Sequence, residues 1–227
     1  MNSPTPAPRV IAIDGPAASG KGTLGRRIAA TLGYAHLDTG GLYRAVALAM
    51  LRAGGDPGDA GAAAVTARGL SADAMASLLA DPGLRDDATG VGASKVAAVP
   101  AVRQALLEFQ RAFAERPPGG ARGAVLDGRD IGTVICPEAP AKLFVTADVE
   151  TRARRRFEEL LARGIPAIYA AVLEDMKDRD ARDSQRAVAP LKPAGDAFLL
   201  NTSALNADQA FDAAMTFIRS KPAFAGV

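Results

Sequence analysis

Cysteine and histidine are nearly absent from this chain of 227 residues, which contains one of each. The single cysteine, Cys136, excludes an internal disulfide bond and a metal site built from cysteines. The single histidine, His36, leaves little room for a histidine metal centre. We therefore interpret both as packing residues and expect other residue types to carry the chemistry of the protein.

The chain also lacks a large excess of charge of either sign. Its 27 basic and 25 acidic residues give a formal net charge of +2, which argues against a protein dedicated to nucleic acids or membrane surfaces. No apolar run approaches the roughly 18 residues of a membrane span. The opening residues, MNSPTPAPR, lack the apolar core of a signal peptide and are rich in proline. We expect a cytoplasmic protein whose residues 1–8 form a disordered arm.

Apolar residues make up 48% of the chain, enough for the core of one domain over residues 1–227. Short apolar runs alternate with longer segments of helical period, which predicts an α/β fold with a central five-stranded parallel sheet and helices on both faces. The predicted strands are residues 9–13, 35–37, 123–126, 142–146 and 197–200. The predicted helices are residues 20–32, 41–53, 101–115, 149–163, 168–179 and 206–219.

Residues 54–92 differ in composition from the rest of the chain, being rich in Ala, Gly and Asp and poor in β-branched residues. This composition predicts an insertion at the rim of the sheet rather than a strand within it. The segment ERPPGGARG, residues 115–123, predicts a loop, because two prolines followed by two glycines end a helix.

The segment GPAASGKGT follows a predicted strand and precedes a predicted helix. In that context a Gly-rich loop directs backbone N–H groups at phosphate oxygens, the helix N-terminus adds positive charge, and Lys21 reaches the outer phosphates. An ordinary flexible turn is the alternative interpretation, and the strand–loop–helix order argues against it. The predicted ATP-phosphate ligands are Gly15, Pro16, Ala17, Ala18, Ser19, Gly20, Lys21, Gly22 and Thr23.

Gly22 stands where such loops usually carry a Ser or Thr whose hydroxyl binds Mg²⁺. A Mg²⁺ ion is then expected to be held mostly by phosphates and water, with Asp127 binding it through water at the end of a predicted strand. The departure argues against a switch GTPase or motor ATPase. It favours a small kinase whose second substrate also carries phosphate.

Four arginines suit a second phosphate, because a guanidinium binds phosphate oxygens at two points and keeps its proton. They lie in three motifs, DTGGLYR, DGRDIGTV and KDRDARDSQR, and are Arg44, Arg129, Arg179 and Arg186. Each motif has a simpler interpretation: a helix cap at Thr39, a surface turn built on Asp and Gly, and a solvated helix with salt bridges. If residues 177–186 are helical, Arg179, Asp183 and Arg186 share one face.

Phosphoryl transfer requires alignment of donor and acceptor and neutralisation of charge on the transferring group. The candidate catalytic residues are Lys21, Arg129, Arg179 and Arg186. The segment TRARRRFEELLARG adds Arg152, Arg155 and Arg156 on one helix, and with the later basic segment it predicts a lid over residues 152–190. We expect Arg152 and Arg156 to bind ATP phosphates; a solvated basic face is the alternative.

Five motifs together resemble the bacterial cytidylate kinases, which pass the γ-phosphate of ATP to CMP or dCMP. They are GPAASGKGT, DTGGLYR, SKVAAVPAVR, DGRDIGTVICPEA and RDARDSQRAVAPLKPA, in the family's order, and the resemblance runs from about Val10 to the last helix. It implies a P-loop kinase fold, ATP with Mg²⁺ as donor, CMP or dCMP as acceptor, and a monomer that binds neither nucleic acid nor membrane.

The resemblance also assigns residues around the acceptor nucleotide. It places Thr39, Arg103, Asp130 and Arg186 at the cytosine, Ser94, Arg179 and Asp183 near the sugar, and Arg44 and Arg129 on the acceptor phosphate. The acceptor-binding insert, residues 54–100, is shorter and poorer in β-forming residues than the three-stranded insert of longer family members, and Thr39 stands where serine is frequent. Another nucleoside-monophosphate kinase, for UMP or AMP, and a non-catalytic nucleotide-binding module are the alternative functions.

Overall fold

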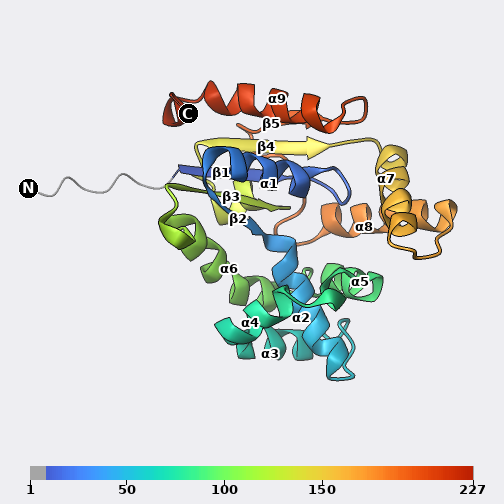
Figure 1. Cartoon of the computed structure of the whole chain (residues 1–227). Helices are drawn as coiled ribbons and strands as arrows, with labels where there is room; N and C mark the ends of the chain where they lie inside the picture. The colour runs from blue at the N-terminus through green and yellow to red at the C-terminus, as the bar shows by residue number, and fades with distance from the viewer. Residues whose placement is uncertain (1–8, 227) are drawn as a thin grey trace, which may run out of the picture. The chain divides into compact units, whose positions relative to one another are not determined.

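The computed structural model describes residues 9–226, so the predicted disordered arm over residues 1–8 lies outside the described residues. The chain divides into two compact units (Figure 1). One, here called the sheet unit, comprises residues 9–37, Arg111–Gln185 and residues 189–226. The other, here called the helical unit, comprises Asp38–Gln110 and Arg186–Val188.

The central sheet has the strand order β2-β3-β1-β4-β5. β1 pairs in parallel with β3 and with β4, and β4 pairs in parallel with β5. The prediction of a five-stranded parallel sheet between helices is confirmed. The strands are β1 (Arg9–Asp14), β2 (Ala35–Asp38), β3 (Gly123–Gly128), β4 (Ala141–Thr146) and β5 (Phe198–Asn201), each within two residues of its predicted bounds.

The sheet's core explains why its strands are apolar along their length rather than alternating. Ile11 and Ile13 on β1 and Val125 on β3 are fully buried, as expected of parallel strands covered on both faces. In the same cluster, Ile28 from α1 (Lys21–Leu32) and Ile218 from α9 (Ala207–Arg219) pack against these strands. The packed sheet is therefore a rigid base for the loops that follow the carboxyl ends of its strands.

Two helices beyond β4, α7 (Val149–Ala162) and α8 (Tyr169–Gln185), pack against each other through a small apolar cluster. The rings of Phe157 and Tyr169 meet edge to face, with centroids 6.1 Å apart. α8 extends six residues beyond its predicted end but stops at Gln185. The expectation that Arg186 continues the helical face of Arg179 and Asp183 is therefore wrong. Leu191 donates its N–H to the Asp183 carbonyl at 2.8 Å, which folds the chain back at this point.

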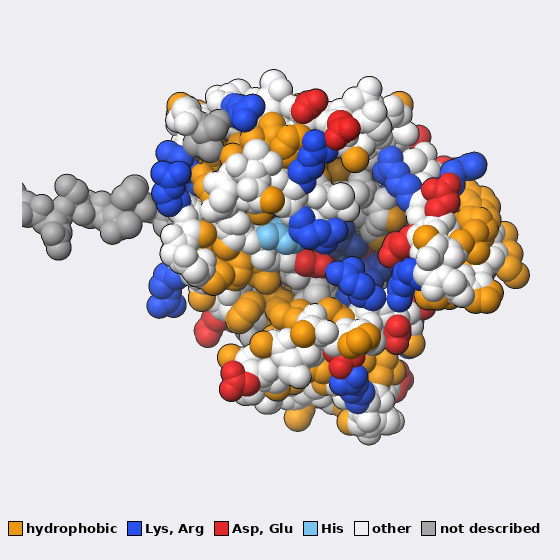
Figure 2. Space-filling model, in the orientation of Figure 1, with side chains coloured by type: hydrophobic (Ala, Val, Ile, Leu, Met, Phe, Trp, Pro, Cys, Tyr) orange, Lys and Arg blue, Asp and Glu red, His pale blue; other side chains and the backbone are white. Residues whose placement is uncertain are grey.

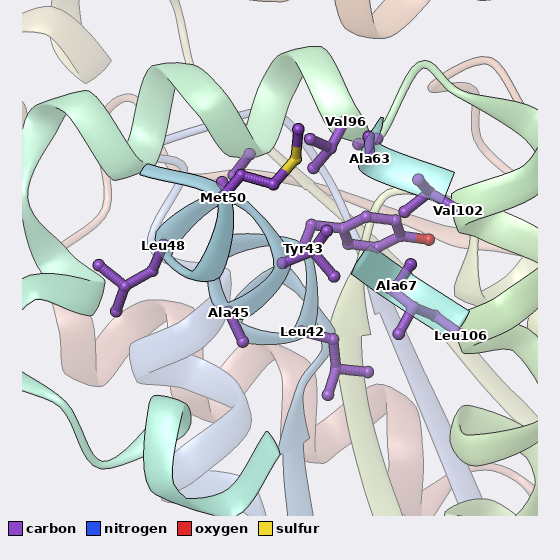
Figure 3. Packing of buried hydrophobic residues seen from close by; sticks show 14 of the residues in the cluster. Leu42, Tyr43, Ala45, Leu48, Met50, Ala63, Ala67, Val96, Val102 and Leu106 are labelled. Atoms are coloured by element: carbon purple, nitrogen blue, oxygen red, sulfur yellow. The ribbon is translucent and has the colours of Figure 1, made fainter. Parts of the chain in front are cut away.

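The helical unit is built around the second helix of the chain (Figure 3). Side chains such as Leu42 and Met50 form a buried cluster with Val96, Val102 and Leu106. Residues 54–92, all of which the structure describes, contain no strand, as the composition predicts. The helices are α2 (Thr39–Arg52), α3 (Ala60–Gly69), α4 (Ala72–Leu79), α5 (Asp87–Val96) and α6 (Pro100–Glu115), whose last residues belong to the sheet unit.

Three of these helices, α3, α4 and α5, were not predicted, although the first two have start signals in the sequence. The side chains of Asp59 and Ser71 accept hydrogen bonds from the N–H groups of Ala62 and Ala74, which caps α3 and α4. Short helical turns complete the chain at Pro82–Arg85, Pro118–Gly120, Ile131–Ile135 and Pro222–Phe224.

Candidate active site

The phosphate loop joins β1 to α1 at the carboxyl end of the sheet. A side chain at Gly15 would collide with the carbonyl oxygen of Val145, so only glycine fits there. Gly20, at φ 89°, precedes α1 and provides no side-chain cap. The first-turn N–H groups of α1 therefore have no capping side chain and form an anion site of the predicted kind. The Lys21 ammonium donates to the Pro16 carbonyl at 3.2 Å, which holds the lysine over its own loop.

Asp127, at the end of β3, lies beside the position where the usual hydroxyl is missing. A Cβ built on Gly22 would lie 3.7 Å from its Oδ1 atom. The other carboxylate oxygen, Oδ2, is 2.7 Å from Nε2 of His36. A buried carboxylate next to a phosphate loop fits Mg²⁺ held through water, because hard cations prefer oxygen ligands.

His36, interpreted from the sequence as a packing residue, also makes a specific polar contact with Asp127. Its side chain, on β2, is partly exposed and visible at the molecular surface (Figure 2), and its ring orients Asp127 on the neighbouring strand β3. The pairing depends on the strand order of the sheet, which no local pattern carries. Cys136, by contrast, behaves as expected: burial raises the pKa of its thiol to about 11, so it stays uncharged. Among residues 9–226, no group of three or more His, Cys, Asp or Glu side chains could hold a metal ion.

Asp14, the last residue of β1, is a buried acid that the sequence did not single out. Its two carboxylate oxygens accept the N–H groups of Ile131 and Gly132 at 2.7 and 2.8 Å. Burial raises the pKa of Asp14 to about 6, although these two hydrogen bonds favour the charged form. The carboxylate thus ties the strand that leads into the phosphate loop to the turn that follows Arg129 and Asp130.

Arg129 and Asp183, two predicted acceptor ligands, are brought together within the sheet unit. The Nε atom of Arg129 donates to Oδ2 of Asp183 at 2.7 Å, and both side chains are largely buried. Asp130 next to Arg129 is buried, and Arg179 lies one helical turn before Asp183 on α8. The turn after β3 and the helix α8 therefore present two arginines and two acids on neighbouring elements.

Arg152 has partners other than the phosphate for which it was predicted. Its guanidinium forms a two-point ion pair with Asp180 and donates to the carbonyls of Ala147 and Ala17. Arg152 thereby connects α7, α8 and the phosphate loop. Arg156 pairs with Glu159 on its own helix at 3.0 Å. A phosphate role for these two arginines stays a prediction.

A cavity of about 360 Å³ adjoins the phosphate loop within the sheet unit. Ser19 and Thr23 line it from the loop and α1, and Thr202 and Asn206 line it from the connection between β5 and α9. Arg155 lies at its edge and donates to both the hydroxyl and the carbonyl of Thr202. Its volume lies in the range of small-ligand sites. No sequence motif marked this connection.

The helical unit holds the remaining predicted acceptor residues. Thr39 is buried as the first residue of α2, but Asp38 caps the helix by accepting the N–H of Gly41 at 3.3 Å, so the capping role suggested for Thr39 is wrong. Arg44 donates to the carbonyl of Leu84 at 3.2 Å, and Gly90 leaves room for its guanidinium.

Two further arginines and a serine belong to the same unit. Arg103 is buried, donates to the Ala97 carbonyl at 3.3 Å and lies over the ring of Tyr43. Ser94 is buried on α5, and Arg186 lies in the short stretch Arg186–Val188 that belongs to this unit.

The sequence of residues 11–220 matches the family described as cytidylate kinase. The chain belongs to the cytidylate kinase family. The cytidylate kinase of Paramagnetospirillum magneticum is 61% identical over 212 residues, which cover 93% of this chain and 98% of that protein. The cytidylate kinase of Rhodospirillum rubrum is 56% identical over the same shares of the two chains.

This chain is similar in fold to a solved structure, that of an uncharacterized protein from Eubacterium ventriosum. The likeness is one of fold alone. The TM-score is 0.53 at 15% sequence identity, over 94% of this chain and 99% of that chain. Among the described residues, no helix is both long and apolar enough to cross a membrane.

Proposed function

We propose that the protein transfers the γ-phosphate of ATP to CMP or dCMP, giving ADP and CDP or dCDP. The observation that carries this proposal is the phosphate loop, with its uncapped α1 N-terminus and Lys21, in a chain that matches the cytidylate kinase family over residues 11–220. Relatives named cytidylate kinase that are 52–61% identical over more than nine-tenths of the chain support the same acceptor. The chain is accordingly a nucleoside-monophosphate kinase, a phosphotransferase.

The donor nucleotide is proposed to bind the phosphate loop and the adjacent cavity of the sheet unit. Its phosphates lie on the loop from Gly15 to Thr23, where N–H groups and Lys21 neutralise their charge. Its base enters the adjacent cavity beside Thr202 and Asn206. Arg156 and Arg152 act from α7, the latter by holding the Ala17 carbonyl of the loop. Residues 152–190 act as a lid that excludes water.

Mg²⁺ is proposed to accompany ATP, held by phosphate oxygens and waters. Bound there, the ion neutralises charge on the β- and γ-phosphates. Asp127 receives its waters beside Gly22, and His36 fixes the orientation of the carboxylate through the 2.7 Å contact to Oδ2. The missing hydroxyl after Lys21 is thus offset by an acid on the neighbouring strand.

The acceptor nucleotide is proposed to bind the residues that the sequence motifs assign to it. Arg44 and Arg129 bind its phosphate, Ser94, Arg179 and Asp183 its sugar, and Thr39, Arg103, Asp130 and Arg186 its cytosine. A carboxylate accepts from the amino group of cytosine, and an arginine donates to the carbonyl and ring nitrogen. Uracil presents the opposite groups, which leaves a buried carboxylate without its donor, so we expect strong selection for cytosine.

Transfer needs no general base, because the attacking group is already a phosphate oxyanion. An oxygen of the CMP phosphate forms a bond to the γ-phosphorus as the bond to the β–γ bridging oxygen breaks, and ADP leaves with both bonding electrons. Lys21, Arg129, Arg179 and Arg186 neutralise the charge that builds on the transferring group. We further propose that the enzyme acts as a cytoplasmic monomer without nucleic-acid or membrane partners.

The test is ADP formation from ATP and Mg²⁺ with CMP, dCMP, UMP, AMP and GMP offered separately. We expect turnover with CMP and dCMP alone, and a loss of about a hundredfold or more in Arg186→Ala. Equal turnover with UMP or AMP would assign the protein to another nucleoside-monophosphate kinase. ATP binding without acceptor-dependent ADP formation would indicate a non-catalytic module.

A further inference from the structure

The chain between β3 and β4 forms a single π-helical turn at Ile131–Ile135, directly after Arg129 and Asp130. Such turns are rare and concentrate at functional sites. Inside it, the Cys136 N–H reaches the Ile131 carbonyl at 2.7 Å, and two further N–H groups converge on the carbonyl of Asp130. We call residues 128–135 the acceptor turn. Its irregular backbone leaves peptide groups at both ends that need partners from outside the turn.

At the N-terminal end of the turn, Asp14 accepts the N–H groups of Ile131 and Gly132. The approach is close: a Cβ on Gly132 would lie 3.4 Å from Oδ2 of Asp14 and 3.2 Å from the side chain of Lys142. A side chain at this position would therefore lie in contact with the carboxylate and would press on the Lys142 side chain. The bond runs from the strand before the phosphate loop to the turn, across 117 residues of sequence.

At the C-terminal end of the turn, Arg111 on α6 supplies the opposite charge. Its Nη2 atom donates to the Val134 carbonyl at 3.0 Å and its Nε atom donates to the Ile135 carbonyl at 3.2 Å. A negative group thus binds the N–H end and a positive group binds the carbonyl end, which matches the direction of the peptide dipoles. All of these residues belong to the sheet unit.

Burying the carboxyl group of Asp14 costs free energy that an apolar side chain at the same position would not cost. It is buried at 4% relative exposure, and burial raises the pKa of its carboxyl group to about 6. The nearby charges partly cancel, since Asp130 disfavours the anion and Lys21 favours it, and Lys142 runs past on β4. The two hydrogen bonds that this buried carboxylate accepts from Ile131 and Gly132 indicate that its role is to place the backbone of the turn.

We propose that Asp14 and Arg111 are positioning residues that fix the acceptor turn, so that Arg129 and Asp130 meet the acceptor nucleotide in the productive geometry. The inference rests on the proposed function, which assigns those two residues to the acceptor. Both residues act through the backbone of the turn, and their loss therefore weakens acceptor binding and cytosine selection before it affects ATP.

The experiment compares Arg111→Ala, Arg111→Lys, Asp14→Asn and the wild type in steady-state kinetics with CMP and UMP. The matched control is Arg116→Ala, an exposed arginine just beyond the same helix. In Arg111→Ala we expect the KM for CMP to rise roughly tenfold, the effect of losing hydrogen bonds to carbonyls, with the KM for ATP changed less than about twofold. The preference for CMP over UMP falls in parallel. Arg111→Lys recovers part of the loss, because an ammonium donates to one of the two carbonyls.

Asp14→Asn places an amide N–H₂ against one of two backbone donors, and we expect a larger rise in the KM for CMP, roughly ten- to a hundredfold. If this variant does not fold by circular dichroism, the Arg111 pair decides the question.

The proposal is overturned if Arg111→Ala matches Arg116→Ala, or if the KM values for CMP and ATP rise together, since a general loss of structure predicts that result. A wild type that shows no preference for CMP contradicts the proposed function instead, and the same variants are then compared on the acceptor that it does use.

Discussion

The two units hold their functional side chains in different ways. In the sheet unit, Asp14, Asp127 and Arg129 each meet an ionisable side chain or two backbone N–H groups at 2.7 to 2.8 Å. In the helical unit, Arg44 and Arg103 donate to the carbonyls of Leu84 and Ala97 at 3.2 and 3.3 Å, and the Arg103 guanidinium also lies over the ring of Tyr43. Ionisable partners and converging N–H groups thus position functional side chains of the sheet unit, and backbone carbonyls and an aromatic ring contribute to the same task in the helical unit.

The apolar cores of the two units also differ, in the size of the side chains that they bury. The sheet unit buries large aliphatic side chains such as Ile11, Ile28 and Leu143. Much of the helical core consists of alanines such as Ala45, Ala47 and Ala63, each of which removes less apolar surface from water. We therefore expect the helical unit to have lower local stability than the sheet unit.

The largest expected effect is the loss of kcat when Lys21, the lysine of the phosphate loop, is replaced. Lys21→Met removes the positive charge beside the transferring group, and we expect kcat to fall about a hundred- to a thousandfold while the protein still folds. Lys221→Met, which removes a lysine stacked on the ring of Phe217, is the control with unchanged kcat. A loss smaller than tenfold in Lys21→Met would remove the lysine from the proposed mechanism.

A second test asks whether the anchoring by charge carries stability as well as geometry. Arg152→Ala leaves Asp180 without its two-point partner and frees the carbonyls of Ala147 and Ala17. We expect the free energy of unfolding to fall by about 3–5 kcal/mol, as measured by urea denaturation. The exposed Arg154 on the same helix provides the matched control, and its replacement by Ala is expected to cost less than about 0.5 kcal/mol. Equal losses in the two variants would show that the buried pair adds nothing.

The pH dependence of stability probes the buried acid of the sheet unit. Because the pKa of Asp14 rises from 3.8 in the unfolded chain to about 6 in the folded protein, the folded state holds the extra proton between these values. The contribution of Asp14 to stability is therefore present below pH 4 and is lost as the pH rises through 6, by about 3 kcal/mol in total.

Urea denaturation of the wild type and Asp14→Asn at pH values from 4 to 7 measures this contribution. We expect the stability difference, variant minus wild type, to become more favourable to the variant as the pH rises through this window. A difference that stays constant with pH would contradict the raised pKa.

Sequence patterns predicted the sheet well because its signals are local. Apolar runs, the GPAASGKGT loop and the turn residues after each strand lie within a few positions of what they specify. The contacts of Asp14 and His36 could not be predicted in this way, since their partners lie on β3 or in the turn after it, and β3 neighbours β1 and β2 only in the folded sheet. Arg186 does not share the helical face of Arg179 and Asp183, because α8 ends at Gln185 and the chain folds back with the Leu191 N–H on the Asp183 carbonyl.

Residues 54–92 of the helical unit were recognised as an insertion, but the three helices α3, α4 and α5 were missed for a different reason. Their composition of Ala and Gly gives weak periodicity, so the caps at Asp59 and Ser71 were the available signals.

The smallest expected effects on stability come from adding one methyl group to a glycine in each unit. Gly69 ends α3 in the helical unit with open space around its missing side chain, and Gly33 follows α1 in the sheet unit at φ 63°. Gly69→Ala is expected to raise stability by about 0.4–1 kcal/mol, because it restricts the unfolded chain without strain in the folded one. Gly33→Ala is expected to lower stability by about 1–2 kcal/mol, because a left-handed residue with a Cβ is strained.

Hydrogen exchange followed with and without CMP locates both effects. The gain from Gly69→Ala should appear as slower exchange confined to the helical unit, and CMP should slow exchange there more than ATP does. If Gly69→Ala instead slows exchange equally in both units, they unfold together, and the lower local stability assigned to the helical unit is wrong.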